Sequence, residues 1–129
     1  MRIWKLKAFD RVAKKADLGD DLLRAVVAEM ESGLTGVDLG GNVFKVRVAR
    51  RGAGKSGGYR VLLALKRRER TIFLYAFAKK DKGNVSHGDL ARLKILASDL
   101  LGSDERGIEQ LTKLGELIEV RGHGEAILQ

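Results

Sequence analysis

The spacing of hydrophobic and polar positions changes along the chain and predicts its elements. Residues 2–6, "RIWKL", alternate and predict a short strand, with Trp4 in the core. Apolar side chains then recur every three or four positions over 8–16 and over the next segment, a spacing typical of two amphipathic helices. Asp20 is the expected N-cap of the second helix, and Gly33 suits its C-terminal end.

From residue 42 the spacing becomes two, which predicts strands. The segment "NVFKVRVA" alternates, so Lys45 and Arg47 share one sheet face. The segment "GYRVLLALK" (58–66) is almost continuously apolar and therefore predicts a central strand. The segment "RRER" then turns the chain into a third strand over 71–80. The short connections favour an antiparallel meander.

The last third returns to helical spacing. Ser86 opens a helix with Asp89 three residues later, a loose capping box, and Gly102 ends it. A short helix over 104–114 and an extended segment over 117–120 follow, with 121–129 as a loose tail. The prediction is one α+β domain over 1–129. In it, two N-terminal helices and a C-terminal helix pack on one face of a small antiparallel sheet of three to four strands.

Composition narrows the class. The chain has 129 residues, 44% of them hydrophobic, which is typical of a single globular domain. It has no cysteine, which excludes disulfides, zinc-finger spacings and thiol nucleophiles. The N-terminal segment lacks the apolar core of a signal peptide, and no apolar run approaches the roughly 18–20 residues that span a bilayer. We therefore expect a cytoplasmic protein without a membrane partner.

Charge is concentrated in the predicted sheet. The net charge is +8, and residues 41–85 carry thirteen Lys and Arg against two acids, while 1–40 are balanced and 86–129 are acidic. A basic block within a compact domain favours a polyanionic partner, nucleic acid above all, over a merely solvated basic surface.

Residues 49–56, "ARRGAGKS", fit the loose form of the phosphate-binding P-loop. A working P-loop needs a helix directly after it, whereas "GGYRV" predicts a strand. It also needs an acid at the end of a parallel strand for magnesium. We therefore expect no nucleotide cofactor. The segment predicts a glycine-rich hairpin loop in which Arg50, Arg51 and Lys55 contact an RNA backbone.

The predicted strands bring further cations together with aromatic side chains, a combination used for phosphate contact and base stacking. The residues expected to carry the chemistry are Arg60, Lys45, Arg47, Lys80 and Lys79, with Tyr75, Phe77 and His87 as further RNA contacts.

The available chemistry follows from the residue types. Metal-dependent nucleases need clustered carboxylates or histidines, but 41–85 hold only Glu69 and Asp81 and no histidine. RNA offers a metal-free route, since its 2′-hydroxyl is an internal nucleophile and Arg or Lys can neutralise charge on the phosphate. A lysine crowded by cations has a lowered pKa and can act as general base. The alternative is a non-catalytic module that binds RNA or an acidic protein through the same patch.

Residues 44–101 resemble the RelE-like toxins of bacterial toxin–antitoxin pairs, in particular the HigB-type branch. "GKSGGYR" and "YAFAKKDKGN" are the most specific segments, and the surrounding layout extends the resemblance over nearly the whole chain. The resemblance implies a small sheet with packed helices and ribosome-dependent cleavage of messenger RNA. It also implies neutralisation by a cognate antitoxin, often with a helix-turn-helix domain.

The resemblance also implies site residues. A Lys-x-Lys-like pair corresponds to Lys45 and Arg47, the arginine of Gly-Tyr-Arg to Arg60, and a basic residue after the last long strand to Lys79 or Lys80. Some relatives place a tyrosine shortly after that strand, where this chain has "GNVSH". Either His87 replaces it or the site relies on Arg and Lys alone, so the general acid and base stay open.

Overall fold

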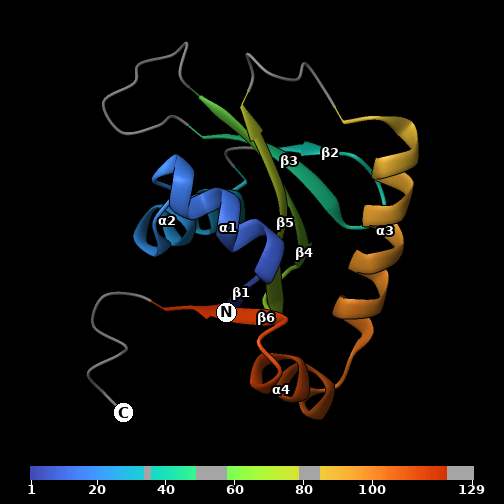
Figure 1. The fold of residues 1–129 in the computed structure, drawn as a ribbon. Helices are drawn as coiled ribbons and strands as arrows, with labels where there is room; N and C mark the ends of the chain where they lie inside the picture. Colours follow the sequence, from blue (N-terminus) through green and yellow to red (C-terminus); the bar gives the residue numbers. More distant parts are fainter. Residues whose placement is uncertain (34–35, 49–57, 79–84, 122–129) are drawn as a thin grey trace.

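The fold is a mixed six-stranded sheet between two layers of helices (Figure 1). The computed structural model describes residues 1–33, 36–48, 58–78 and 85–121. No helix within these ranges has the length and apolar character required to cross a membrane. The elements are β1 (Arg2–Leu6), α1 (Lys7–Ala16), α2 (Asp20–Glu31), β2 (Val37–Asp38), β3 (Val43–Val48), β4 (Tyr59–Lys66), β5 (Arg70–Ala78), α3 (His87–Gly102), α4 (Glu105–Lys113) and β6 (Leu117–Val120).

The sheet order, β2-β3-β4-β5-β1-β6, confirms the antiparallel meander of β3, β4 and β5 with β4 inside the sheet. The predicted count of three to four strands is wrong, and so is the purely antiparallel sheet. Strand β1 pairs with β5 in parallel and with β6 in antiparallel fashion. Because β1 and β5 are separated by two helices and three strands, no local pattern in the sequence reveals their pairing.

Helices cover both faces of the sheet, so the prediction of one covered face is also wrong (Figure 1). One apolar cluster joins α1 and α2 to the sheet through residues such as Phe9, Leu23 and Phe73. The other joins α3 and α4 to the opposite face around Trp4, Ile72 and Leu100. Burial on both faces explains why β4 is almost continuously apolar.

Of the two predicted N-caps, Ser86 is confirmed and Asp20 is wrong. Ser86 caps α3 as predicted, since its hydroxyl accepts a hydrogen bond from the Asp89 backbone N–H. The N-cap of α2 is Gly19, and Asp20 is the first helical residue, where its charge still favours the helix dipole. Asp20 instead accepts a hydrogen bond from Lys5, which competes with a capping role.

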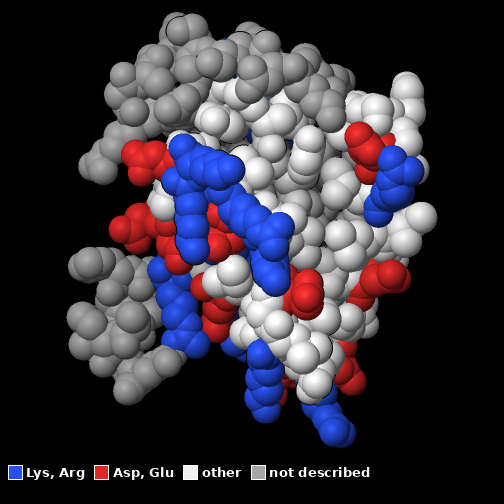
Figure 2. Space-filling view, viewed as in Figure 1, with Lys and Arg blue, Asp and Glu red and all other residues white. Residues whose placement is uncertain are grey.

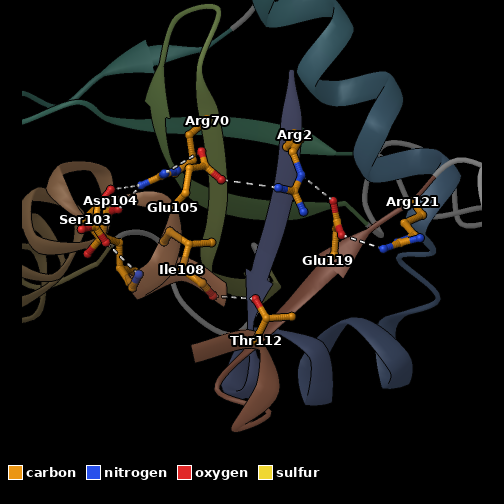
Figure 3. Close-up of polar contacts among 11 residues, drawn as sticks. Arg2, Arg70, Ser103, Asp104, Glu105, Ile108, Thr112, Glu119 and Arg121 are labelled. Atoms are coloured by element: carbon orange, nitrogen blue, oxygen red, sulfur yellow. Dashed lines mark hydrogen bonds and ion pairs between the residues drawn. The ribbon is translucent and has the colours of Figure 1, made fainter. Parts of the chain in front are cut away.

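Arg70 is a buried cation that ties the sheet to α3 (Figure 3). Its Nη1 donates to the carbonyl oxygens of Leu100 and Ser103, at 2.8 Å each, and its Nη2 lies 3.6 Å from Glu105. A guanidinium thus satisfies carbonyl groups at the C-terminal end of a helix, where cations are favoured. The last residue of the "RRER" segment, Arg70, is therefore the first residue of β5 and stabilises the fold, in addition to the turn that the segment was predicted to form.

Two carboxylates link stability to pH. Arg2 donates to Glu119 at 2.9 Å, and this bond holds the Glu119 pKa below its ordinary value of 4.5, against the opposing effect of burial. Burial raises the pKa of Asp10, but bonds from Lys5 and Lys14 outweigh it and leave that pKa below 3.8. Each carboxylate contributes its full stabilisation of the folded state above the pKa that it has in the unfolded chain. This stabilisation is lost as the pH falls through the lower pKa of the folded state.

We therefore expect the urea midpoint to fall steeply below about pH 4. Urea titrations followed by circular dichroism at pH 7, 5, 4 and 3 measure this dependence. Glu119→Gln, which removes one linked carboxyl, should flatten the acid limb. A midpoint that stays constant from pH 6 to pH 3 would contradict this assignment.

Candidate functional site

Cationic and aromatic side chains meet at one end of the sheet, on the face that α3 covers. Directly paired residues on neighbouring strands point to the same face. The register places Arg47 opposite Arg60, and Arg60 opposite Phe77. The next row joins Lys45 to Leu62 and Leu62 to Tyr75. Lys45, Arg47 and Arg60 come from these two adjacent rows, and we call the three residues together the cationic row.

The cationic row concentrates positive charge at this end of the sheet. Like charges directly opposite each other destabilise a sheet, and Arg47 and Arg60 are such a pair. Among the described residues, no acid forms an ion pair with Lys45, Arg47 or Arg60. Within the same part of the chain, the Nη1 atom of Arg60 is buried and has no hydrogen-bond partner. A buried unpaired donor is costly, so this arrangement favours a bound anion.

A bulge in β5 brings the aromatic rings to this face. The register shifts between Leu62 and Leu63, so that Leu63 pairs with Phe73 whereas Leu62 pairs with Tyr75. Strict alternation from Phe73 would place Tyr75 and Phe77 on the α1 side. The extra residue moves both side chains to the α3 side instead, and bulges near functional sites commonly redirect side chains in this way. The Tyr75 and Phe77 rings lie 5.8 Å apart at 40°.

The basic residues of the 41–85 segment lie at two opposite ends of the sheet. Lys66 pairs with Glu69 at 3.1 Å, and Arg70 binds carbonyl groups, both at the end opposite the Arg47–Arg60 pair. Elsewhere, basic and acidic side chains are interspersed over α1 and α2 (Figure 2). Only part of the sequence's basic block therefore belongs to the cationic row.

The other predicted RNA contacts have different environments. Tyr75 is half-buried, whereas Phe77 is only 6% exposed, which leaves little of its ring for stacking. His87 is exposed at the first position of α3. The remaining predicted site residues lie outside the described residues: Arg50, Arg51, Lys55, Lys79 and Lys80.

A cavity beside Tyr75 was not predicted from the sequence. It has a volume of about 340 Å³ and is lined by Tyr75, Asp89, Arg92, Leu93 and Leu96. Helical spacing predicts that the leucines share a face of α3, but the register that brings them to Tyr75 depends on the fold.

In the described part of the chain, no cluster of three or more His, Cys, Asp or Glu side chains could hold a metal ion.

Together these features define a small α+β protein with a basic site on one sheet face. The family model described as the RelE toxin of the RelE / RelB toxin–antitoxin system matches residues 1–120. The chain therefore belongs to the RelE toxin family, whose members are toxins of toxin–antitoxin pairs and generally translation-inhibiting ribonucleases. No curated protein matches the chain.

Proposed function

We propose that this protein is a toxin of the HigB-type branch that cleaves messenger RNA on the ribosome without a metal ion. A cognate antitoxin, with a helix-turn-helix domain, would neutralise it in the cytoplasm. The observation that carries the proposal is the buried Nη1 of Arg60, which has no partner among the described residues and lies in the cationic row. An RNA phosphate supplies both the acceptor and the negative charge that this row lacks.

The proposed reaction uses the 2′-hydroxyl of the RNA. Its oxygen forms a bond to phosphorus while the bond from phosphorus to the 5′-oxygen breaks, and the products carry a 2′,3′-cyclic phosphate and a 5′-hydroxyl. The 2′-hydroxyl proton passes to a general base, and a general acid protonates the leaving 5′-oxygen. Arg60 and Arg47 stabilise the charge that develops on the phosphate oxygens.

The general base and acid are drawn from the predicted residues. Lys45 lies two residues from Arg47 on the same face, in the row that Leu62 joins to Tyr75. Lys79 and Lys80 follow β5 in the sequence, and His87 begins α3. The cationic row binds the phosphate in this proposal, and alanine substitution of each of the other residues assigns the general base and the general acid.

Induction of the wild-type chain in a bacterial host tests the function. The expected result is growth arrest together with new 5′ ends in reporter messenger RNA, mapped by primer extension, and relief when the cognate antitoxin is co-expressed. Growth arrest without new RNA ends would instead favour a non-catalytic module that binds RNA or an acidic protein. Unimpaired growth and intact RNA would contradict the proposal.

Metal independence is tested with purified protein and programmed ribosomes. Because Mg²⁺ maintains ribosomes, only the toxin is treated with EDTA and dialysed, and its cleavage of ribosome-bound messenger RNA is compared with that of untreated toxin. We expect cleavage rates within about twofold of each other, since charge stabilisation comes from side chains. Loss of cleavage after EDTA treatment and its return with a divalent ion would contradict the metal-free route.

A further inference from the structure

Another cavity lies between α3 and the turn that joins β2 to β3, at the end of the sheet opposite the Arg47–Arg60 pair (Figure 1). Its volume is about 270 Å³. Leu101, two glycines and four polar residues line it, the polar ones being Asn42, Lys66, Lys94 and Ser98. Because this lining includes two cations and no carboxylate among the described residues, the cavity has the charge of an anion site.

The turn between β2 and β3 holds Lys94 close to its backbone. Gly40, Gly41 and Asn42 all have positive φ angles, of 87°, 62° and 63°, which glycine and asparagine adopt most readily. A Cβ atom on Gly40 would lie 3.2 Å from the Lys94 Nζ, and one on Gly41 would lie 3.4 Å from the Lys94 Cγ. The lack of side chains at these two positions therefore lets the half-buried Lys94 lie across the turn, with its ammonium group at the cavity.

Several donors around the cavity have no acceptor in the described part of the chain. The hydroxyls of Ser103 and Thr112 each donate to the carbonyl oxygen four residues earlier, whereas the Ser98 hydroxyl makes no such bond there. Within the same ranges, the Lys94 ammonium and the Asn42 amide also have no hydrogen-bond partner. Unused donors beside positive charge favour an anion that has several acceptor oxygens.

Two neighbouring negative groups leave this positive charge available. The Lys66 Nζ lies 3.1 Å from Glu69, but the side chains are 50% and 60% exposed, and such surface pairs are weak. The carboxyl end of α3 is the negative end of a helix dipole, but Arg70 already donates to two carbonyl oxygens there. The charges of Lys66 and Lys94 therefore remain available to a ligand.

We propose that this cavity binds a phosphate group, either as inorganic phosphate or as the end of a small phosphomonoester. Two ammonium groups match the charge of about −1.5 to −2 that a phosphomonoester carries at neutral pH, whereas each phosphate of an RNA backbone carries a single charge. The volume is below the roughly 300–1,000 Å³ typical of pockets for larger ligands.

This phosphate site is separate from the proposed cleavage site. Lys66 and Arg60 lie near opposite ends of β4, about 20 Å apart along the strand. A ligand at this distance from the scissile phosphate takes no part in RNA cleavage. It instead ties α3 to the turn between β2 and β3, so its binding stabilises the folded state.

Thermal unfolding in phosphate tests the site. Melting temperatures of the wild type, Lys94→Met and Arg67→Met are measured in sodium phosphate and in sodium chloride of equal ionic strength. Methionine keeps an apolar stem on the turn and removes the charge. Arg67 is exposed beside Lys66 and does not line the cavity, so Arg67→Met is the matched control for net charge. Phosphate bound by the cationic row contributes equally to all three proteins, so the difference between the variants reports on this cavity.

Two further ligands distinguish the source of the phosphate group. Glycerol phosphate replaces inorganic phosphate in one arm, and a short RNA with 2′-deoxyribose at each position, which blocks cleavage, replaces it in the other. A shift with inorganic phosphate alone identifies the free ion as the ligand, and an equal or larger shift with glycerol phosphate identifies a phosphomonoester.

We expect the wild type and Arg67→Met to melt on the order of 5 °C higher once phosphate exceeds its Kd about tenfold. Lys94→Met should bind phosphate at least about tenfold more weakly, since it lacks one of the two charges. If Lys94→Met does not fold, Asn42→Gly, which tolerates the positive φ and removes the amide, is compared with Arg67→Met in its place.

Equal phosphate shifts in Lys94→Met and Arg67→Met would overturn the proposal. A shift that depends on Lys94 with the RNA alone would overturn it in favour of a contact with nucleic acid. Because no RNA is cleaved in these measurements, their outcome is independent of the proposed ribonuclease function.

Discussion

Replacing Arg60 with alanine is expected to lower messenger RNA cleavage by about 10²- to 10³-fold, the usual effect of removing one donor that stabilises transition-state charge. The side chain is on the central strand β4, between Arg47 and Phe77, and its Nη1 is buried without a partner in the described part of the chain. Arg60→Lys keeps one charge but loses the planar fork, so we expect an intermediate rate. Single-turnover cleavage on programmed ribosomes measures all three proteins.

Stability provides the control for this substitution. Removing Arg60 relieves a like-charge pair with Arg47 and removes a buried donor that has no partner among the described residues, so the free energy of unfolding should stay unchanged or rise. Lys66→Ala, which removes a cation from the opposite end of the same strand, should retain wild-type cleavage. Full activity in folded Arg60→Ala, or equal losses in Lys66→Ala, would contradict the assignment of the site.

The second large effect concerns stability. Lys5 is 7% exposed, and its Nζ lies 2.7 Å from Asp10 and 2.9 Å from Asp20. Burial disfavours its charge, but hydrogen bonds to both carboxylates outweigh this and raise the pKa of Lys5 overall. The ammonium joins β1 to α1 and α2. Loss of one partner of such a group leaves a buried charge without compensation.

Lys5→Met keeps most of the side-chain volume and should lower the free energy of unfolding by roughly 3 kcal/mol, at the low end for buried pairs because Lys14 still contacts Asp10. The melting temperature should fall by on the order of 10 °C. Adding Asp10→Asn should recover part of the loss, since the buried charge disappears. Lys15→Met, an exposed control on α1, should change stability by less than about 0.5 kcal/mol. Equal melting temperatures for Lys5→Met and Lys15→Met would contradict this account.

Local patterns in the sequence predict much of the site. Alternation over 43–48 places Lys45 and Arg47 on one face, and the continuous apolar run of β4 places it inside the sheet, as observed. Ser86 begins α3 as its capping pattern indicates. These features depend on residues close together in the chain, where side-chain period and hydrogen bonding act directly.

Other features depend on contacts between distant segments and could not be predicted in this way. The pairing of β1 with β5 and β6 is set by the packing of the whole domain. The bulge beside Leu63 changes the face of Tyr75 without any glycine or proline to mark it. Likewise, Arg70 resembles a turn residue in the sequence, and only the position of the α3 carboxyl end makes it structural.

The most direct test of the central claim is the fate of an RNA that lacks one hydroxyl group. Wild-type toxin acts on ribosome-bound messenger RNA with either a ribose or a 2′-deoxyribose at the mapped cleavage position, and the ends of the products are identified. The account predicts a 2′,3′-cyclic phosphate and a 5′-hydroxyl from the ribose substrate and no cleavage at the deoxyribose position. Cleavage of the deoxyribose substrate at the same bond, or products with a 5′-phosphate, would contradict it.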